Sequence, residues 1–166
     1  PSVDSGVELN GTLTLPKESG KYPAVVLVSG SGTQNRDEEL LGHKPFKVLA
    51  DYLTRRGIIV LRYDDREFAS KKYEGATSRN YANDALGAVE FLKSIDKVDS
   101  KRIGIIGHSE GGTIAFMCAA KNKEIDFIVS LAGMAVAGDK CLQEQNRRAI
   151  AITGLSEEIQ NKCIEV

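Results

Sequence analysis

The 166-residue sequence predicts an α/β fold in which a mostly parallel, doubly wound sheet carries helices on both faces. Short, continuous apolar runs alternate with amphipathic segments of helical length, which is typical of such a sheet. A glycine-rich turn joins the third apolar run to an apolar helix. The net charge is −1 and 42% of the residues are hydrophobic, so the composition indicates one domain with a sizeable core and gives no sign of nucleic-acid binding.

The first third of the chain predicts two strands and one helix. Apolar and polar residues alternate from Val7 to Leu15, which predicts a strand with one buried face. We expect it to flank the sheet in antiparallel orientation. Ala24–Val28 is a buried strand, and Ser29–Asp37 is a loop of small and polar residues. A helix is expected from Pro45 to Arg56, with Gly57 in the usual place after a helix end.

The middle of the chain repeats this strand and helix pattern. Ile58–Leu61 predicts the second buried strand, and a polar loop follows it as far as Ser78. Apolar residues with helical spacing predict a helix over Tyr81–Lys93. We expect a turn at Asp96–Lys101 and the third buried strand at Ile103–Ile106. The order of these elements favours right-handed crossovers.

The last part of the chain changes character. An apolar helix follows the glycine-rich turn, and Phe127–Leu131 predicts the fourth buried strand. From Asp139 onward the sequence predicts helices at Asp139–Thr153 and Ser156–Val166, without another strand. Ser156 is followed by two glutamates, which is a favourable helix start.

The most informative stretch is the turn Gly107-His108-Ser109-Glu110-Gly111, which has the pattern G-x-S-x-G between a strand and a helix. So tight a turn would strain the backbone of Ser109, and side chains would crowd it at Gly107 and Gly111. The serine hydroxyl would lie above the N-terminus of a helix, whose free N–H groups suit a developing oxyanion. The alternative interpretation is a glycine-rich turn with an ordinary serine.

This turn and the stretch Ser29-Gly30-Ser31-Gly32-Thr33-Gln34-Asn35-Arg36-Asp37-Glu38 together resemble the α/β-hydrolases. The resemblance is to the bacterial esterase and serine-aminopeptidase-like group, near the dienelactone hydrolases and prolyl oligopeptidases, and it runs from about Gly6 to the C-terminus. It implies a serine hydrolase that acts on carboxylic ester bonds. The nucleophile would be Ser109, and backbone N–H groups of Glu110 and Ser31, with Gly32 as second choice, would form the oxyanion hole.

The resemblance also implies an acid and a histidine after the nucleophile, which this chain does not supply. Its two histidines, His43 and His108, both precede Ser109. His108 should point away from the site, and His43 is more simply a solvated loop histidine. Asp139 is a weak candidate for the acid. We therefore expect a chain that stops before the last core strands, with residues 1–138 as the N-terminal part of an incomplete α/β-hydrolase core and residues 139–166 as the start of a helical cap.

Several alternatives and absences complete these expectations. A serine peptidase or acyltransferase of the same fold, or a non-catalytic binding module that keeps the turn, would fit the same residues. We expect a small-molecule ester or acyl substrate, no cofactor or metal, no nucleic-acid or membrane partner, and self-association through an open sheet edge. Glu67 stands where the family often has glycine. Pro1 is not an initiator methionine, so either a cytoplasmic location or export with a removed signal fits the sequence. The three cysteines have no metal-like spacing: Cys118, Cys141 and Cys163.

Overall fold

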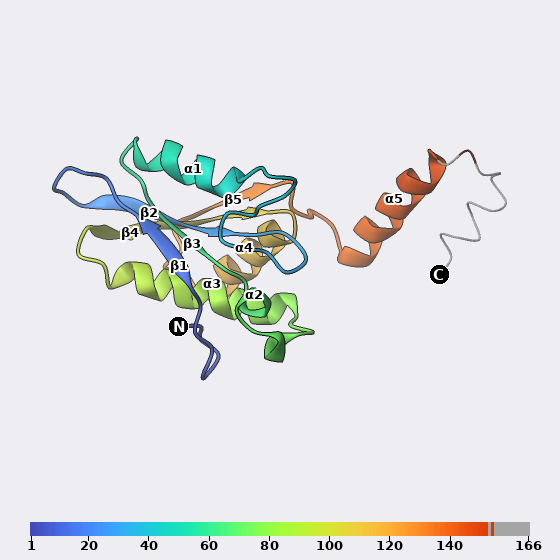
Figure 1. Ribbon diagram of the computed structural model, residues 1–166, viewed down its shortest axis with the longest axis horizontal. Coiled ribbons are helices and arrows are strands. Elements are labelled where there is room, and N and C mark those ends of the chain that lie inside the picture. Colours follow the sequence, from blue (N-terminus) through green and yellow to red (C-terminus); the bar gives the residue numbers. More distant parts are fainter. Residues whose placement is uncertain (153, 155–166) are drawn as a thin grey trace. The chain divides into compact units, whose positions relative to one another are not determined.

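A computed structural model describes residues 1–152 and residue 154, and it divides the chain into two units, Pro1–Gly133 and Met134–Val166. The first unit contains a five-stranded sheet with the strand order β1-β3-β2-β4-β5 (Figure 1). Four strands are parallel, and β1 pairs with β3 in antiparallel orientation, as the sequence predicts. The strands are β1 (Gly11–Thr14), β2 (Tyr22–Val28), β3 (Ile59–Tyr63), β4 (Val98–His108) and β5 (Phe127–Leu131).

Helices cover both faces of this sheet. α1 lies on one face, and α3 and α4 pack side by side on the other (Figure 1). The short helices α2 and η1 lie in the connection between β3 and α3. The helices of this unit are α1 (Pro45–Thr54), α2 (Arg66–Ala69), η1 (Lys71–Tyr73), α3 (Ser78–Lys93) and α4 (Glu110–Lys121).

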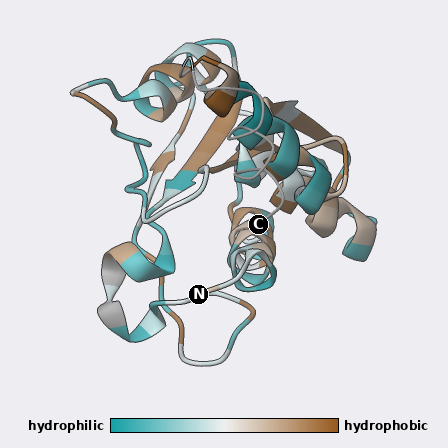
Figure 2. Ribbon diagram, turned by 90° about the vertical axis from the view of Figure 1, so that its right-hand side faces the viewer, coloured by the Kyte–Doolittle hydropathy of each residue, from teal (hydrophilic) through white to brown (hydrophobic). Residues whose placement is uncertain are grey.

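The hydrophobic core has two layers because the central strands are buried on both faces. Along β2, Val25 and Leu27 pack toward Phe46 and Ala50 of α1. The alternate residues of the same strand pack toward α3 and α4. In Figure 2, strands of the sheet are coloured largely as hydrophobic. The continuous apolar runs of the sequence therefore belong to doubly covered parallel strands, as predicted.

Several element boundaries differ from those predicted. β1 is shorter than the alternating stretch, because only Gly11–Thr14 pairs with β3. β4 begins at Val98, within the expected turn, because Val98 pairs with Tyr22 at a register shift. α3 begins at Ser78, where the side chains and backbone N–H groups of Thr77 and Asn80 form a reciprocal capping box. The spacing of apolar residues, which predicted a helix from Tyr81, could not locate this earlier start.

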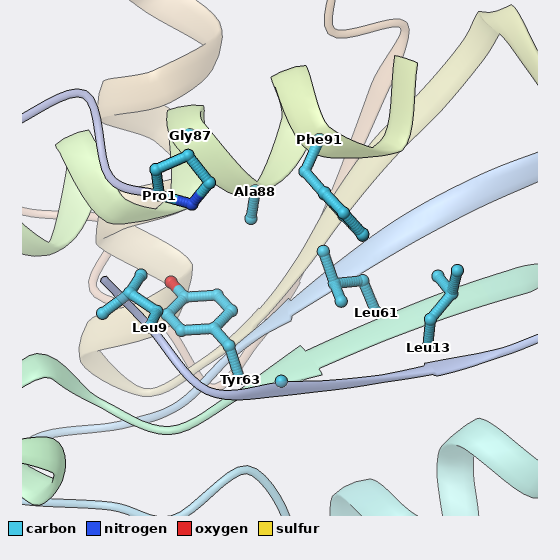
Figure 3. Close-up of a pocket in the computed structure, with 9 residues that line it drawn as sticks. Pro1, Leu9, Leu13, Leu61, Tyr63, Gly87, Ala88 and Phe91 are labelled. Carbon is cyan, nitrogen blue, oxygen red and sulfur yellow. The ribbon is translucent and has the colours of Figure 1, made fainter. Parts of the chain in front are cut away.

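A cavity of about 250 Å³ lies between the first strand, β3 and α3 (Figure 3). None of its lining residues belongs to the Ser109 turn or to residues 29–38. The side chains around it are almost all apolar. They are Pro1, Leu9, Leu13, Leu61, Tyr63, Ala88 and Phe91, with the backbone of Gly11 and Gly87.

The second unit contains α5 (Gly138–Ala151), which agrees with the first of the two predicted tail helices. None of its residues is fully buried. The second predicted tail helix, Ser156–Val166, lies outside the described residues. Among the residues that the structure describes, no helix combines the length and the apolar character needed to cross a bilayer.

Candidate active site

Ser109 occupies a strained turn between β4 and α4. Its backbone has φ +53° and ψ −118°, which is unusual for a residue with a side chain. Its N–H donates to the carbonyl of Leu131 at the end of β5 (2.8 Å), and its own carbonyl accepts from Gly112 (3.0 Å). The predicted strain at this position is confirmed, and hydrogen bonds on both sides of Ser109 hold the turn in place.

The glycines on either side of Ser109 are required by close backbone contacts. A Cβ atom on Gly107 would lie 1.9 Å from the carbonyl oxygen of Gly111. One on Gly111 would lie 2.1 Å from the carbonyl oxygen of Val28, at the end of β2. Both neighbours are backbone atoms and cannot turn aside as a flexible side chain could. The G-x-S-x-G spacing therefore follows from packing of the turn against itself and against β2.

The N-terminus of α4 lies directly after Ser109. Glu110 is its first residue, so the Glu110 N–H has no partner within the helix. The Glu110 carboxylate accepts a hydrogen bond from the Ser78 hydroxyl at 2.5 Å. The Glu110 side chain is thus hydrogen-bonded to α3, while its backbone N–H, at the positive end of the helix dipole, can donate to a ligand.

Residues 29–38, which we call the β2 loop, pass next to Ser109. A Cβ atom on Gly30 would lie 3.2 Å from the Cβ atom of Ser109. Ser31, the predicted oxyanion donor, is exposed, and its carbonyl accepts from the Gln34 side chain (3.3 Å). Within residues 1–152, the Ser31 N–H has no hydrogen-bond acceptor. The structure therefore brings the predicted loop and the predicted nucleophile together.

Asp64, directly after β3, fixes the middle of the β2 loop. Its carboxylate accepts from the Arg36 backbone N–H (2.7 Å), from Arg36 Nε (3.0 Å) and from Arg36 Nη2 (2.5 Å). Burial alone would raise the pKa of the Asp64 carboxyl, but the bonds from Arg36 together lower it. Arg62, at the end of the same strand, forms an ion pair with Asp37. This region of β3 thus anchors two successive loop residues.

Asp65 fixes the beginning of the β2 loop. Its carboxylate accepts from the Ser29 hydroxyl (2.9 Å) and from the Gln34 backbone N–H (2.8 Å). Burial is the largest influence on this group and raises its pKa to about 7, although the two donors partly oppose the shift. The carboxylates of Asp84 and Glu67 raise it further.

The connection after Asp65 is also held by charged side chains. Arg66 is buried and pairs with Asp84 (2.7 Å) and Asp4 (2.8 Å). Glu67 accepts from the Ala76 backbone N–H (3.0 Å) and from the Thr33 hydroxyl (3.3 Å). Glu67, which stands where the family often has glycine, therefore links α2 to the β2 loop.

These anchoring residues were not among the predicted site residues. Asp64 and Asp65 could have been found, because charged residues that directly follow a buried parallel strand lie at the carboxyl edge of the sheet, where ligands bind. Their partners could not, because Arg36 and Gln34 are about thirty residues away in the sequence.

No catalytic base can be assigned among the described residues, because neither of the two histidines is hydrogen-bonded to Ser109 there. His108 Nδ1 lies 2.8 Å from Glu38 Oε1, so this side chain faces the β2 loop. His43 forms an isolated bridge with Leu40 and lines an apolar groove that His108 also lines. Asp139 lies in the first turn of α5, in the second unit. Among the described residues, the Ser109 hydroxyl has no hydrogen-bond partner, and no cluster of three or more His, Cys, Asp or Glu side chains could hold a metal.

Comparison with known proteins places this geometry in a family. The sequence matches the model of the dienelactone hydrolase family over residues 9–158. The chain belongs to the dienelactone hydrolase family. Its fold is the α/β-hydrolase fold, and an esterase and a dipeptidyl peptidase are among the relatives of the chain.

Three relatives illustrate the range of this similarity. Esterase EstD of Thermotoga maritima is 38% identical over 139 residues, or 82% of this chain and 33% of its own length. Human dipeptidyl peptidase 8 is 29% identical over 80% of this chain and 16% of its own length. The structure of Est1E from Butyrivibrio proteoclasticus with bound ferulic acid has a TM-score of 0.67 and 25% identity, and it covers 89% of this chain and 56% of Est1E. The chain therefore spans a sixth to about half of the length of these relatives.

Proposed function

We propose that this protein hydrolyses small carboxylic esters through Ser109, with the N–H groups of Glu110 and Ser31 as oxyanion donors. The observation that carries the proposal is the Ser109 turn itself. A residue with a side chain is held at φ +53° between two glycines, directly before a helix and beside Gly30. Strained backbone of this kind concentrates at functional sites, and the hydrolase family of the chain makes acyl transfer the appropriate chemistry.

The reaction follows from the groups around the turn. The Ser109 oxygen attacks the ester carbonyl carbon, a base takes its proton, and the oxyanion accepts hydrogen bonds from the two N–H groups. The carbon–oxygen bond to the alcohol then breaks, the alcohol leaves with the proton, and water hydrolyses the acyl-serine. We place the base and its acid beyond the described residues, because neither His43 nor His108 bonds to Ser109 within residues 1–152. In the same proposal, α5 begins a helical cap.

The relatives support an ester as the substrate. EstD, which has the higher identity of the two, is called an esterase, and the structure of Est1E has ferulic acid bound. A second candidate is hydrolysis of a peptide bond, which the similarity to dipeptidyl peptidase 8 favours. Both activities use the same nucleophile and differ in the leaving group, so a paired assay separates them.

The test compares full-length wild type and Ser109→Ala on p-nitrophenyl acetate and on a dipeptidyl p-nitroanilide. We expect ester turnover in the wild type and a loss of roughly 10⁴- to 10⁶-fold in kcat for Ser109→Ala. Ser94→Ala removes a distant hydroxyl whose one hydrogen bond within the described part of the chain is to the Phe91 carbonyl, and it should keep the wild-type rate. Wild-type ester turnover by Ser109→Ala would refute the proposal, and preference for the anilide would favour the peptidase.

The 166-residue chain by itself should turn over esters slowly or not at all. Without a base, the Ser109 hydroxyl would behave as an ordinary alcohol at neutral pH. The oxyanion donors alone can support only a modest residual rate. Rapid turnover of p-nitrophenyl acetate that Ser109→Ala abolishes would mean that the base lies within these residues, and His43 would be the first to test.

A further inference from the structure

We propose that Glu38 is a positioning residue for this reaction, because its carboxylate joins the β2 loop to the Ser109 turn. The inference rests on the proposed function, since it concerns the alignment of the oxyanion donor at Ser31. Glu38 does not contact the Ser109 hydroxyl, so it acts through Gly30 and His108.

One carboxylate oxygen makes both contacts. Glu38 Oε1 accepts a hydrogen bond from the Gly30 backbone N–H at 2.8 Å and lies 2.8 Å from His108 Nδ1. The side chain of Glu38 is 10% exposed and that of His108 is 46% exposed. An ionised carboxylate can only accept, so the hydrogen-bond pattern places a proton on His108 Nδ1. The two chain segments joined in this way are 70 residues apart in sequence.

The local backbone turns Glu38 toward the interior of the protein. Its φ is +50°, in the left-handed region that non-glycine residues rarely occupy. The Glu38 N–H donates to the Asn35 carbonyl (2.9 Å), and the Asn35 side chain accepts from the N–H groups of Asp37 (3.0 Å) and Glu39 (3.3 Å). The contacts of Asn35 close this turn, and the turn directs the Glu38 carboxylate from a surface loop toward the interior.

The contact removes one loop N–H from those that can serve the substrate. The Gly30 N–H is used by Glu38, whereas the next N–H groups along the chain, those of Ser31, Gly32 and Thr33, have no acceptor among the described residues, and Ser31 is the first of them. Gly30 is also packed against Ser109, since a Cβ atom there would lie 3.2 Å from the Ser109 Cβ atom and 3.4 Å from both Glu38 Oε1 and His108 Nδ1. Gly30 is therefore held between Glu38 and the nucleophile, directly before the Ser31 N–H.

Loss of this contact should affect the transition state more than substrate binding. An oxyanion donor must lie within about 2.7–3.1 Å of the oxygen where charge develops. Without Glu38, the part-buried Gly30 N–H would lose its partner, and the Ser29–Gly30 peptide could rotate to find another, which would change the backbone dihedrals of Gly30. The Ser31 N–H would then turn away from the oxyanion. This predicts a fall in kcat with little change in KM.

The experiment uses the full-length protein and four variants that separate the hydrogen bonds from the charge. Glu38→Gln keeps an oxygen acceptor for Gly30, whereas Glu38→Ala removes it. His108→Asn places an amide nitrogen where Nδ1 lies, whereas His108→Gln places it nearer to Nε2. Glu39→Ala is the matched control, because the neighbouring Glu39 is exposed and its carboxylate contacts only Lys44 and the Asn35 side chain among residues 1–152. Initial rates with p-nitrophenyl acetate give kcat and KM, and thermal unfolding checks each fold.

We expect Glu38→Ala to lower kcat by about 10- to 100-fold, with KM within threefold of wild type. Glu38→Gln should recover most of that loss, and His108→Asn should be faster than His108→Gln. If Glu38→Ala does not fold, the comparison of Glu38→Gln with wild type and of the two His108 variants decides the question. A Glu38→Ala rate equal to that of Glu39→Ala would overturn the inference, as would equal losses in Glu38→Gln and Glu38→Ala. Ser109→Ala distinguishes failure of the proposed function from failure of this inference. If Ser109→Ala is inactive while Glu38→Ala has the wild-type rate, only the positioning role of Glu38 is wrong.

Discussion

The two sides of the Ser109 turn are stabilised in different ways. On one side, the β2 loop is joined to the end of β3 by buried charged groups, Arg62, Asp64 and Asp65. On the other side, β5 gives Ser109 one backbone hydrogen bond through Leu131. Three apolar side chains of β5 are 37–40% exposed: Phe127, Val129 and Leu131. In the described part of the chain, this strand pairs only with β4.

This difference indicates how the candidate site is preorganised. A loop that must present an N–H group at a defined position cannot depend on apolar packing alone, because its backbone groups need directional partners. The charged residues after β3 supply those partners within the first unit. β5 depends mainly on strand pairing, and its open edge can accept a further strand. The β2 loop should therefore be destabilised by the loss of a single polar side chain, whereas β5 should tolerate single side-chain substitutions.

The largest effect should come from Asp64→Ala. This change leaves Arg36 Nε, Nη2 and the Arg36 backbone N–H without their acceptor in a pair whose Asp64 side chain is 8% exposed and whose Arg36 side chain is 30% exposed. Removal of one partner from such a pair should lower the free energy of unfolding by about 2–4 kcal/mol. Urea unfolding of the 166-residue chain measures it.

Asp51→Ala is the control for Asp64→Ala, because it breaks an exposed pair with Arg55 on α1. Its effect should fall within the error of the measurement. If the two variants are equally stable, the anchoring role of Asp64 is wrong.

A smaller effect should come from Asp65, and it should depend on pH. Burial raises the pKa of this carboxyl from its ordinary 3.8 to about 7 in the folded state. Between these values the unfolded chain has lost the proton that the folded chain keeps, so this group makes stability fall as pH rises from about 4 to about 7. The lowered pKa values of Asp4 and Asp64 act in the opposite direction, with stability lost as pH falls through the acidic range.

Asp65→Asn isolates this contribution. The amide oxygen can still accept from the Gln34 N–H, and the Ser29 hydroxyl can turn to accept from the amide nitrogen. Relative to wild type, the variant should gain about 1–2 kcal/mol of stability on going from pH 5 to pH 8. A constant difference between the two proteins over this range would show that Asp65 does not titrate there.

The smallest effect on stability should come from the β5 edge. Val129→Lys places a charge on a partly exposed position of an edge strand, and it should change the free energy of unfolding by less than about 1 kcal/mol. The same change should reduce the self-association that we expect of the 166-residue chain. Light scattering at several concentrations measures the association, and wild type that stays monomeric throughout would remove this expectation.

The backbone of the fold could be predicted from sequence because its signals are local. Apolar runs mark buried strands wherever helices cover both faces, and the pattern G-x-S-x-G specifies a turn whose glycines meet backbone atoms. The extension of β4 back to Val98 was missed because it depends on a register shift opposite Tyr22, which only the folded sheet reveals.

The contacts of the supporting residues could not be predicted in the same way. Asp64 and Asp65 accept from Arg36 and Gln34, 28 and 31 residues away in sequence, and Glu38 joins Gly30, 8 residues away, to His108, 70 residues away. A single sequence gives no sign of such pairs. The polar loop predicted after β3 contains α2 and η1, because Arg66 and Glu67 make tertiary contacts there that override local preference. The nucleophile itself stays a prediction, because local geometry shows a strained serine and its reactivity needs a separate measurement.

Covalent labelling tests the central claim most directly. Full-length protein is treated with a fluorophosphonate, and peptide mapping by mass spectrometry locates the adduct. We predict one phosphonylated residue, Ser109, with no labelling of Ser109→Ala or of heat-unfolded protein, because only an activated serine beside oxyanion donors reacts rapidly. An adduct on a different serine, or full esterase activity without any adduct at Ser109, would contradict the account.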